Sequence, residues 1–163
     1  MTTFVGIKML KDQTAGQNAK FRAWLDAGLL QNFGPDEHFD WWAFPIDRPS
    51  RRYGEKYDIS VVLDELRSDA QFLGDVLGNA RMLMAAWRWD LDSARSVDET
   101  LYPRYGVRLW KCGLSLHVLG MPRAFLSVQS FAVSHREERT SDTWAKLELS
   151  EANPVGVDIA RIP

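Results

Sequence analysis

The stretch SDAQFLGDVLGNARMLMAAWRWD, residues 68–90, decides the fold because it carries the clearest helical pattern of the chain. Ser68 and Gln71 form a capping-box pattern at its start. Gly74 and Gly78 each weaken a helix interior by about 1 kcal/mol relative to alanine, so we expect a close neighbouring backbone to compensate. Its apolar residues keep the three-then-four spacing of one buried helical face: Ala70, Leu73, Val76, Leu77, Ala80, Leu83, Met84 and Trp87. We therefore predict a central helix on which a β-sheet packs.

A second helix is expected from about Ala15 to Phe33. Thr14 and Gln17 form another capping-box pattern before it, and Gly34-Pro35 supplies a stop signal after it. The residues from Phe4 to Leu10 alternate weakly between apolar and polar, which favours a first strand.

The rest of the chain favours antiparallel sheet. Residues 57–64 alternate with period two and predict a strand, although a short helix is the alternative there. Residues 110–118 alternate in the same way, and residues 125–133 have the apolar content of a central return strand. Two more strands are expected around 145–149 and 155–159. The prediction is a single α+β domain over residues 1–163, with a largely antiparallel β-sheet packed against two main helices.

Composition fits one soluble globular domain. The chain has 163 residues, 45% hydrophobic content and a net charge of -2, so it has no global attraction to nucleic acid or acidic membranes. Cys112 is the only cysteine, and its position between apolar neighbours favours a buried thiol. No secretory or membrane-spanning segment and no cofactor motif is evident. We expect a cytoplasmic protein without cofactor or metal, and a homodimer is an open alternative.

Two polar clusters could carry chemistry. Asp36, Glu37, His38 and Asp40 are residue types of hard-metal and acid-base sites, but their spacing matches no known metal signature, and an exposed loop is the favoured explanation. Ser115 with His117 could belong to a nucleophile site, yet no third member is evident.

The second cluster is the basic stretch Arg48–Lys56. It holds Arg48, Arg51 and Arg52 with interleaved tyrosines, a combination suited to phosphate capture and to stacking on bases. Acidic residues lie among these arginines, so a solvated surface is the alternative.

Seven tryptophans are the unusual feature of the composition. In an extended Trp41-Trp42-Ala43-Phe44, Trp41 faces one way while Trp42 and Phe44 face the other, so one face is left for a second layer or a partner. Trp87 and Trp89 pose the same question: on one helix they lie about 200° apart, so both cannot point inward.

Three short motifs follow one another along the chain: Trp42-Ala43-Phe44-Pro45, Tyr57-Asp58-Ile59 and Val76-Leu77-Gly78. Their order resembles that of a bacterial protein family to which no activity is attached. The spacing after Ile59 departs from that order, and the last third of the chain is not covered. The resemblance therefore implies no function.

Two functional hypotheses follow. The first is a non-catalytic protein of immunity or inhibitor type that binds another macromolecule, most plausibly a protein, through large aromatic and arginine anchors. Its predicted partner-binding residues are Trp41, Trp42, Phe44, Arg48, Arg51, Arg52 and Trp89. The alternative is a small enzyme or an anion- or phosphate-binding protein, with a pocket between residues 35–56 and the sheet, in which His38, Asp40, Arg48 and Arg52 act. A concave pocket on which these side chains converge would favour the alternative.

Overall fold

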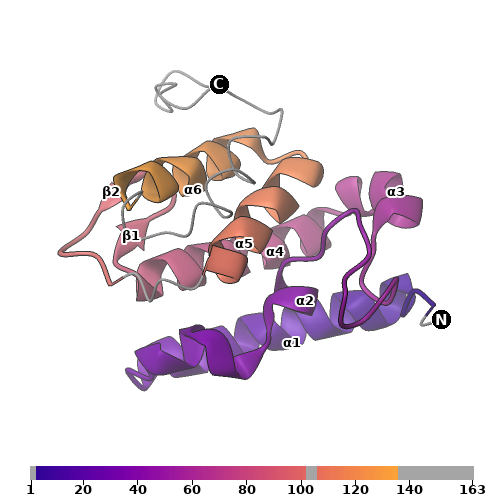
Figure 1. Ribbon diagram of the computed structural model, residues 1–163, viewed down its shortest axis with the longest axis horizontal. Coiled ribbons are helices and arrows are strands. Elements are labelled where there is room, and N and C mark those ends of the chain that lie inside the picture. The colour runs from indigo at the N-terminus through magenta and orange to yellow at the C-terminus, as the bar shows by residue number, and fades with distance from the viewer. Residues whose placement is uncertain (1–2, 102–105, 136–163) are drawn as a thin grey trace.

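Helices form most of the molecule in the computed structural model, which describes residues 3–101 and 106–135 (Figure 1). The α-helices are α1 (Ile7–Asp26), α2 (Asp40–Ala43), α3 (Leu63–Arg67), α4 (Ala70–Ala86), α5 (Gly106–Val118) and α6 (Pro122–Ser134). The short 3-10 helices are η1 (Leu30–Phe33), η2 (Pro35–Glu37) and η3 (Ser60–Val62). Within the described residues, the strands β1 (Trp89–Asp90) and β2 (Arg95–Ser96) pair in antiparallel fashion.

The helices are arranged as two packed pairs with a short connector. Helix α1 packs along α4, and α5 packs along α6 (Figure 1). Helix α2 contacts both α1 and α5, so this single turn joins the two pairs. The position of α2 matters for the candidate site because its side chains can contact both α1 and α5.

The predicted central helix is confirmed as α4. Its cap is Asp69 rather than Ser68, because the Asp69 carboxylate accepts the backbone N–H of Phe72 at 2.9 Å. The expected close approach at Gly78 is made by a side chain instead of a backbone. A Cβ at Gly78 would lie 2.6 Å from Asn18 Nδ2 of α1.

The first helix begins earlier in the chain than predicted. Helix α1 already begins at Ile7, so the strand expected over Phe4–Leu10 does not form. Thr14 lies inside the helix, where its buried hydroxyl donates to the carbonyl oxygens of Leu10 and Trp42 at 2.9 and 2.8 Å.

Helix α1 also ends earlier than predicted, at Asp26. Gly28 has a φ of +69°, and the N–H of Leu29 bonds back to the carbonyl of Trp24 at 2.8 Å. This is a Schellman-type end, for which glycine is suited because it has no Cβ.

The large antiparallel sheet was predicted wrongly. Residues 110–118 and 125–133 belong to α5 and α6, and the 57–64 segment forms η3 and α3, the short-helix alternative. Both α5 and α6 bury residues on nearly every side, so neither shows a solvated face in its sequence. The strands expected at 145–149 and 155–159 lie outside the described residues.

Tryptophans at the end of α4 both point into the core. Helix α4 ends at Ala86, and Arg88 has a φ of +61°, so the chain turns and redirects Trp89 inward. Trp87 stacks on Phe131 with centroids 5.7 Å apart, and Trp89 meets the same ring edge-on at 5.5 Å. The prediction that only one of them points inward was wrong because it assumed a continuous helix.

Candidate functional site

A cavity of about 700 Å³ lies between α2, the 46–52 segment and the N-terminal half of α5. Residues that line it come from three separate parts of the sequence: His38, Asp40 and Trp41; Ile46, Arg48, Pro49, Ser50, Arg51 and Arg52; Val107, Arg108, Trp110 and Lys111. The predicted pocket beside residues 35–56 is therefore present, but its opposite wall is a helix rather than a sheet.

Helix α2 fixes one wall of the cavity. The aromatic run predicted as a strand is this single helical turn, so adjacent tryptophans point in different directions. Trp42 faces α1, where its Nε1 donates to Gln17 Oε1 at 2.9 Å. Trp41 faces α5, with the Lys111 amine 2.9 Å from its ring centroid. The turn thus ties the cavity to the N-terminal helix.

A buried charged cluster forms the inner part of the site. Arg108 Nη1 pairs with Asp40 Oδ1, and Lys111 Nζ lies 3.1 Å from Asp40 Oδ2. The exposed fractions of the Asp40, Arg108 and Lys111 side chains are 1%, 1% and 4%. Arg108 and Lys111 are three residues apart on α5 and therefore share a helical face. Two cations thus share one carboxylate away from water.

Further contacts hold Arg108 in place. Its Nη2 donates to the carbonyl oxygen of Pro35 at 3.0 Å, and its guanidinium lies over the Phe39 ring at 4.6 Å. Both partners belong to the segment that leads into α2, so the guanidinium organises that segment as well as Asp40.

Lys111 is the strongly shifted base of the cluster. The pKa of Lys111 is lowered from 10.5 to about 8, chiefly by burial; the contact with Asp40 opposes this shift, and the charge of Arg108 adds a smaller decrease. The contact with Asp40 therefore does not fully offset the desolvation of the Lys111 amine.

Arginines form the outer rim of the cavity. Arg48, Arg51 and Arg52 are exposed residues that line it from one side. Arg48 pairs with Asp47 at 3.1 Å, and Arg52 lies 5.5 Å from the centroid of the Tyr53 ring. The rim thus presents cations to any ligand that enters.

A hydrogen-bonded turn positions this rim. Ser50 and Gly54 exchange two backbone hydrogen bonds of 2.9 and 3.0 Å, and the Ser50 hydroxyl accepts the N–H of Tyr53 at 2.8 Å. Gly54 closes the turn with a φ of +53°. The arginines therefore stand on a defined turn rather than on an irregular loop.

The structure gathers only part of the predicted partner-binding set. Trp41, Arg48, Arg51 and Arg52 meet at the cavity, as do His38 and Asp40 of the alternative hypothesis. Trp42 is half-buried against α1.

The other two predicted anchors lie in the hydrophobic core. Phe44 is fully buried, and Trp89 is 6% exposed with its Nε1 donating to Ser127 Oγ at 3.1 Å. Neither side chain is presented to solvent. Ser115 is also buried, and His117 packs on Phe125 with ring centroids 5.3 Å apart.

Arg108 and Lys111 are the site residues that the sequence reasoning missed. In the strand predicted over 110–118, Lys111 shares the polar parity of Ser115 and His117, so that prediction places its side chain on the solvent-facing side. Their spacing of three residues was the available signal, because it gathers two basic side chains only on a helix.

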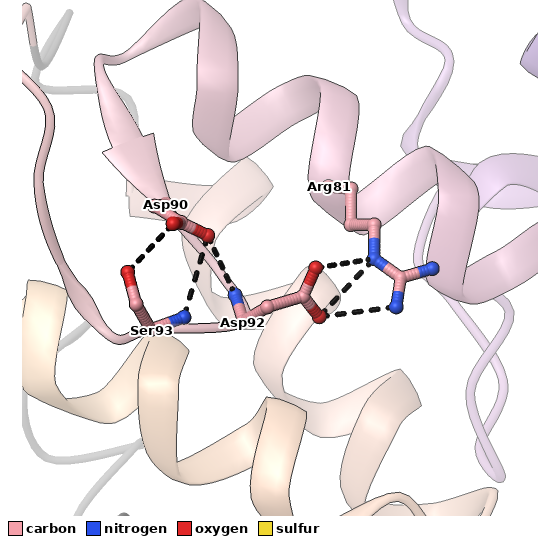
Figure 2. Close-up of polar contacts among 4 residues, drawn as sticks. All are labelled: Arg81, Asp90, Asp92 and Ser93. Atoms are coloured by element: carbon pink, nitrogen blue, oxygen red, sulfur yellow. Dashed lines mark hydrogen bonds and ion pairs between the residues drawn. The ribbon is translucent and has the colours of Figure 1, made fainter.

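A second cavity of about 450 Å³ lies between α4, the residues after β1 and the start of α6. Figure 2 shows its main charged contact: Arg81 holds Asp92 through Nε and Nη2, with distances of 2.9 to 3.2 Å. Asp90 accepts the backbone N–H of Asp92 at 3.0 Å and the Ser93 hydroxyl at 2.6 Å, which fixes this turn. Of the two arginines that line this cavity, Arg81 and Arg123, the first already has a carboxylate partner in Asp92.

Metal-binding, membrane-spanning and thiol features of the described residues are the remaining candidates for a site. Residues 3–101 and 106–135 contain no group of three metal-binding side chains, and none of their helices is both long and apolar enough to cross a membrane. Cys112 is buried as predicted, and burial raises the pKa of its thiol. No known protein family, curated protein or solved structure matches the chain.

Proposed function

We propose that the protein binds a small anionic ligand, one that carries a phosphate or carboxylate group, in the cavity between α2 and α5. The observation that supports this proposal is the charge of the lining. Among the described residues that line the cavity, five have cationic side chains and one has a carboxylate: Arg48, Arg51, Arg52, Arg108 and Lys111, with Asp40. Guanidinium groups suit such ligands because their planar N–H donors match the oxygens of carboxylate and phosphate.

The buried cluster gives an energetic reason for an anion. The side chain of Lys111 is 4% exposed, and this burial lowers the pKa of its amine to about 8 in spite of the contact with Asp40. A buried ammonium is unfavourable in a medium of low dielectric constant. An anion in the cavity would stabilise the charged form of Lys111, and it would raise the pKa of Lys111 back toward its ordinary value.

The size of the cavity also fits a small ligand. About 700 Å³ lies within the range of roughly 300 to 1,000 Å³ that is usual for small-molecule sites. Trp41 and Trp110 are half-buried in its wall and add apolar surface. The rim arginines would meet the ligand first, and the deeper cations would then hold it in a drier environment.

Calorimetric titration with inorganic phosphate, pyrophosphate and a small phosphate monoester tests the proposal. We expect binding that weakens with added salt. The double substitution Arg51→Ala and Arg52→Ala should weaken it about tenfold, since each removes one charge-assisted contact. Arg22→Ala is the matched control, because Arg22 is an exposed arginine of α1 that does not line this cavity.

Two results would contradict the proposal. If the double variant and the Arg22→Ala control bound the anion with equal affinity, the anion would not bind in the cavity. Much tighter binding of a short single-stranded oligonucleotide than of the monoester would instead point to nucleic acid at the basic rim, in line with the stretch Arg48–Lys56.

Binding of another protein stays a prediction with narrower support. Of its expected anchors, Trp41, Arg48, Arg51 and Arg52 remain accessible around the cavity, and they could meet acidic groups of a partner. Because Phe44 and Trp89 lie in the core, the aromatic part of that hypothesis rests on Trp41 and on the half-buried Trp42.

A further inference from the structure

Lys111 combines the features of a reactive amine. Its side chain is 4% exposed, yet it lines the cavity that the arginines surround. The amine is fixed from two sides, by the Trp41 ring with its centroid at 2.9 Å and by Asp40 Oδ2 at 3.1 Å. A desolvated lysine beside another cation is the usual setting of lysines that react with carbonyl groups.

We propose that Lys111 forms an imine with an aldehyde or ketone that also carries a phosphate or carboxylate group. This inference rests on the proposed function, because the rim arginines Arg48, Arg51 and Arg52 would hold the anionic end of that molecule. The carbonyl end would then point toward the buried amine at the inner part of the cavity.

The step balances without any further reactant. The Lys111 ammonium first releases a proton to water in the cavity. The lone pair of the amine then attacks the carbonyl carbon, and the resulting carbinolamine loses its hydroxyl group as water after taking up a proton. One C=N bond replaces one C=O bond, and one water leaves. Loss of water from the protonated carbinolamine gives the iminium ion directly, a cation that Asp40 can pair with, as it does with the ammonium.

Other lysines of the chain make useful comparisons with Lys111. Lys8 and Lys11 are ion-paired with Asp12 and Asp69, and these partners raise the pKa of each amine. Burial instead lowers the pKa of Lys111, so a larger fraction of its amine is unprotonated near neutral pH. Lys20 is exposed on α1 and serves as an ordinary reference amine.

Reductive trapping of the full chain tests the inference. Pyridoxal 5′-phosphate is the probe, since it joins an aldehyde to a phosphate, and borohydride fixes the adduct for peptide mapping by mass spectrometry. We expect Lys111 to be modified at least about tenfold faster than Lys20. Pyridoxine 5′-phosphate, which has the phosphate but no carbonyl, should bind without an adduct and slow the labelling of Lys111.

Variants separate recognition from reaction. Arg51→Ala with Arg52→Ala should slow the labelling of Lys111 about tenfold while that of Lys20 is unchanged. Lys111→Arg should abolish the principal adduct, whereas Lys20→Arg should not. If Lys111→Arg fails to fold, the adduct map of the unmodified sequence still gives the answer.

Each outcome decides the matter. Binding of pyridoxine 5′-phosphate without modification of Lys111 by the aldehyde overturns this inference and leaves anion binding in place. Absence of both binding and adduct overturns the two proposals together. Labelling spread evenly over Lys20, Lys56 and Lys111, or labelling of Lys111 unaffected by loss of the arginines, overturns the inference as well.

Discussion

Two carboxylates of this protein pair with arginine side chains, one on the exposed surface and the other in the buried interior. Asp92 meets Arg81 through several contacts of 2.9 to 3.2 Å, but the side chains are 63% and 49% exposed (Figure 2). Asp40 meets Arg108 and Lys111 where all three are nearly sealed from water. Hydrogen-bond geometry alone would rank the first contact at least as high as the second.

The difference teaches that burial decides what each carboxylate does. A solvated pair gains about 0–1 kcal/mol, because water competes for both partners and salt screens them. The buried cluster has lost that water, so each of its charges depends on the others. We therefore expect the buried cluster to respond more strongly to pH and to substitution than the surface pair does.

Asp40→Asn, at the buried carboxylate, should have the largest effect on the free energy of unfolding. It removes the buried carboxylate that Arg108 and Lys111 share, and we expect the free energy of unfolding to fall by about 3–5 kcal/mol. Urea denaturation measures this, and faster alkylation of the buried Cys112 gives a second readout of opening. A loss below about 1 kcal/mol would mean that the cluster is solvated.

Raising the pH should sharpen the comparison at the buried end. Because the pKa of Lys111 is about 8 in the fold and 10.5 in the unfolded chain, the unfolded chain binds more protons between these values. The contribution of Lys111 to the free energy of unfolding therefore rises from about pH 8 to pH 10.5, by at most about 3 kcal/mol.

Lys111→Met isolates that contribution. The variant lacks the titrating amine, so the difference between its pH–stability curve and that of the original chain should show the rise. Parallel curves for the two proteins would be inconsistent with a lowered pKa. At neutral pH the variant keeps the balanced pair of Asp40 and Arg108, and we expect it to be no less stable by more than about 1 kcal/mol.

Asp92→Asn should have the smallest effect. The free energy of unfolding should fall by less than about 1 kcal/mol at low salt, and by less still in 1 M sodium chloride, where exposed charges are screened. Thermal unfolding at the two salt concentrations measures this. A loss as large as that of Asp40→Asn would remove the distinction between the two regions.

The helix α4 could be predicted because one of its faces stays polar. Its apolar residues then stand out at helical spacing; the cap was misplaced by one residue, from Ser68 to Asp69, and the helix ends at Ala86 rather than near Asp90. A cap depends on local backbone geometry that several neighbouring polar residues could satisfy equally well.

Helix α5 could not be predicted in the same way because it is enclosed on nearly every side. Cys112, Leu114 and Leu116 are buried, and so is Ser115 between them, so the alternation that suggested a strand carries no information about orientation. Lys111 was expected in solvent for the same reason. Its buried partner Asp40 is remote in sequence, and such pairing is set by tertiary structure.

Sequence reasoning pointed to the parts of the candidate site whose residues lie close together in the chain. The stretch Arg48–Lys56 drew attention to the rim, and His38 with Asp40 drew attention to the adjoining wall. Its other half depends on a helix that the sequence pattern concealed. The cavity therefore appears only when two distant segments are placed together.

The separation between those segments has a consequence for biosynthesis. Asp40 and Arg108 are 68 residues apart, so a ribosome that adds about 5–20 residues per second needs roughly 3–14 s to make the second after the first. During that interval the Asp40 carboxylate is solvated by water, and the turn that carries Arg48, Arg51 and Arg52 has already been synthesised. The cavity between α2 and α5 is thus among the last parts of the described chain to form, and a nascent chain halted before α5 would have no means of completing it.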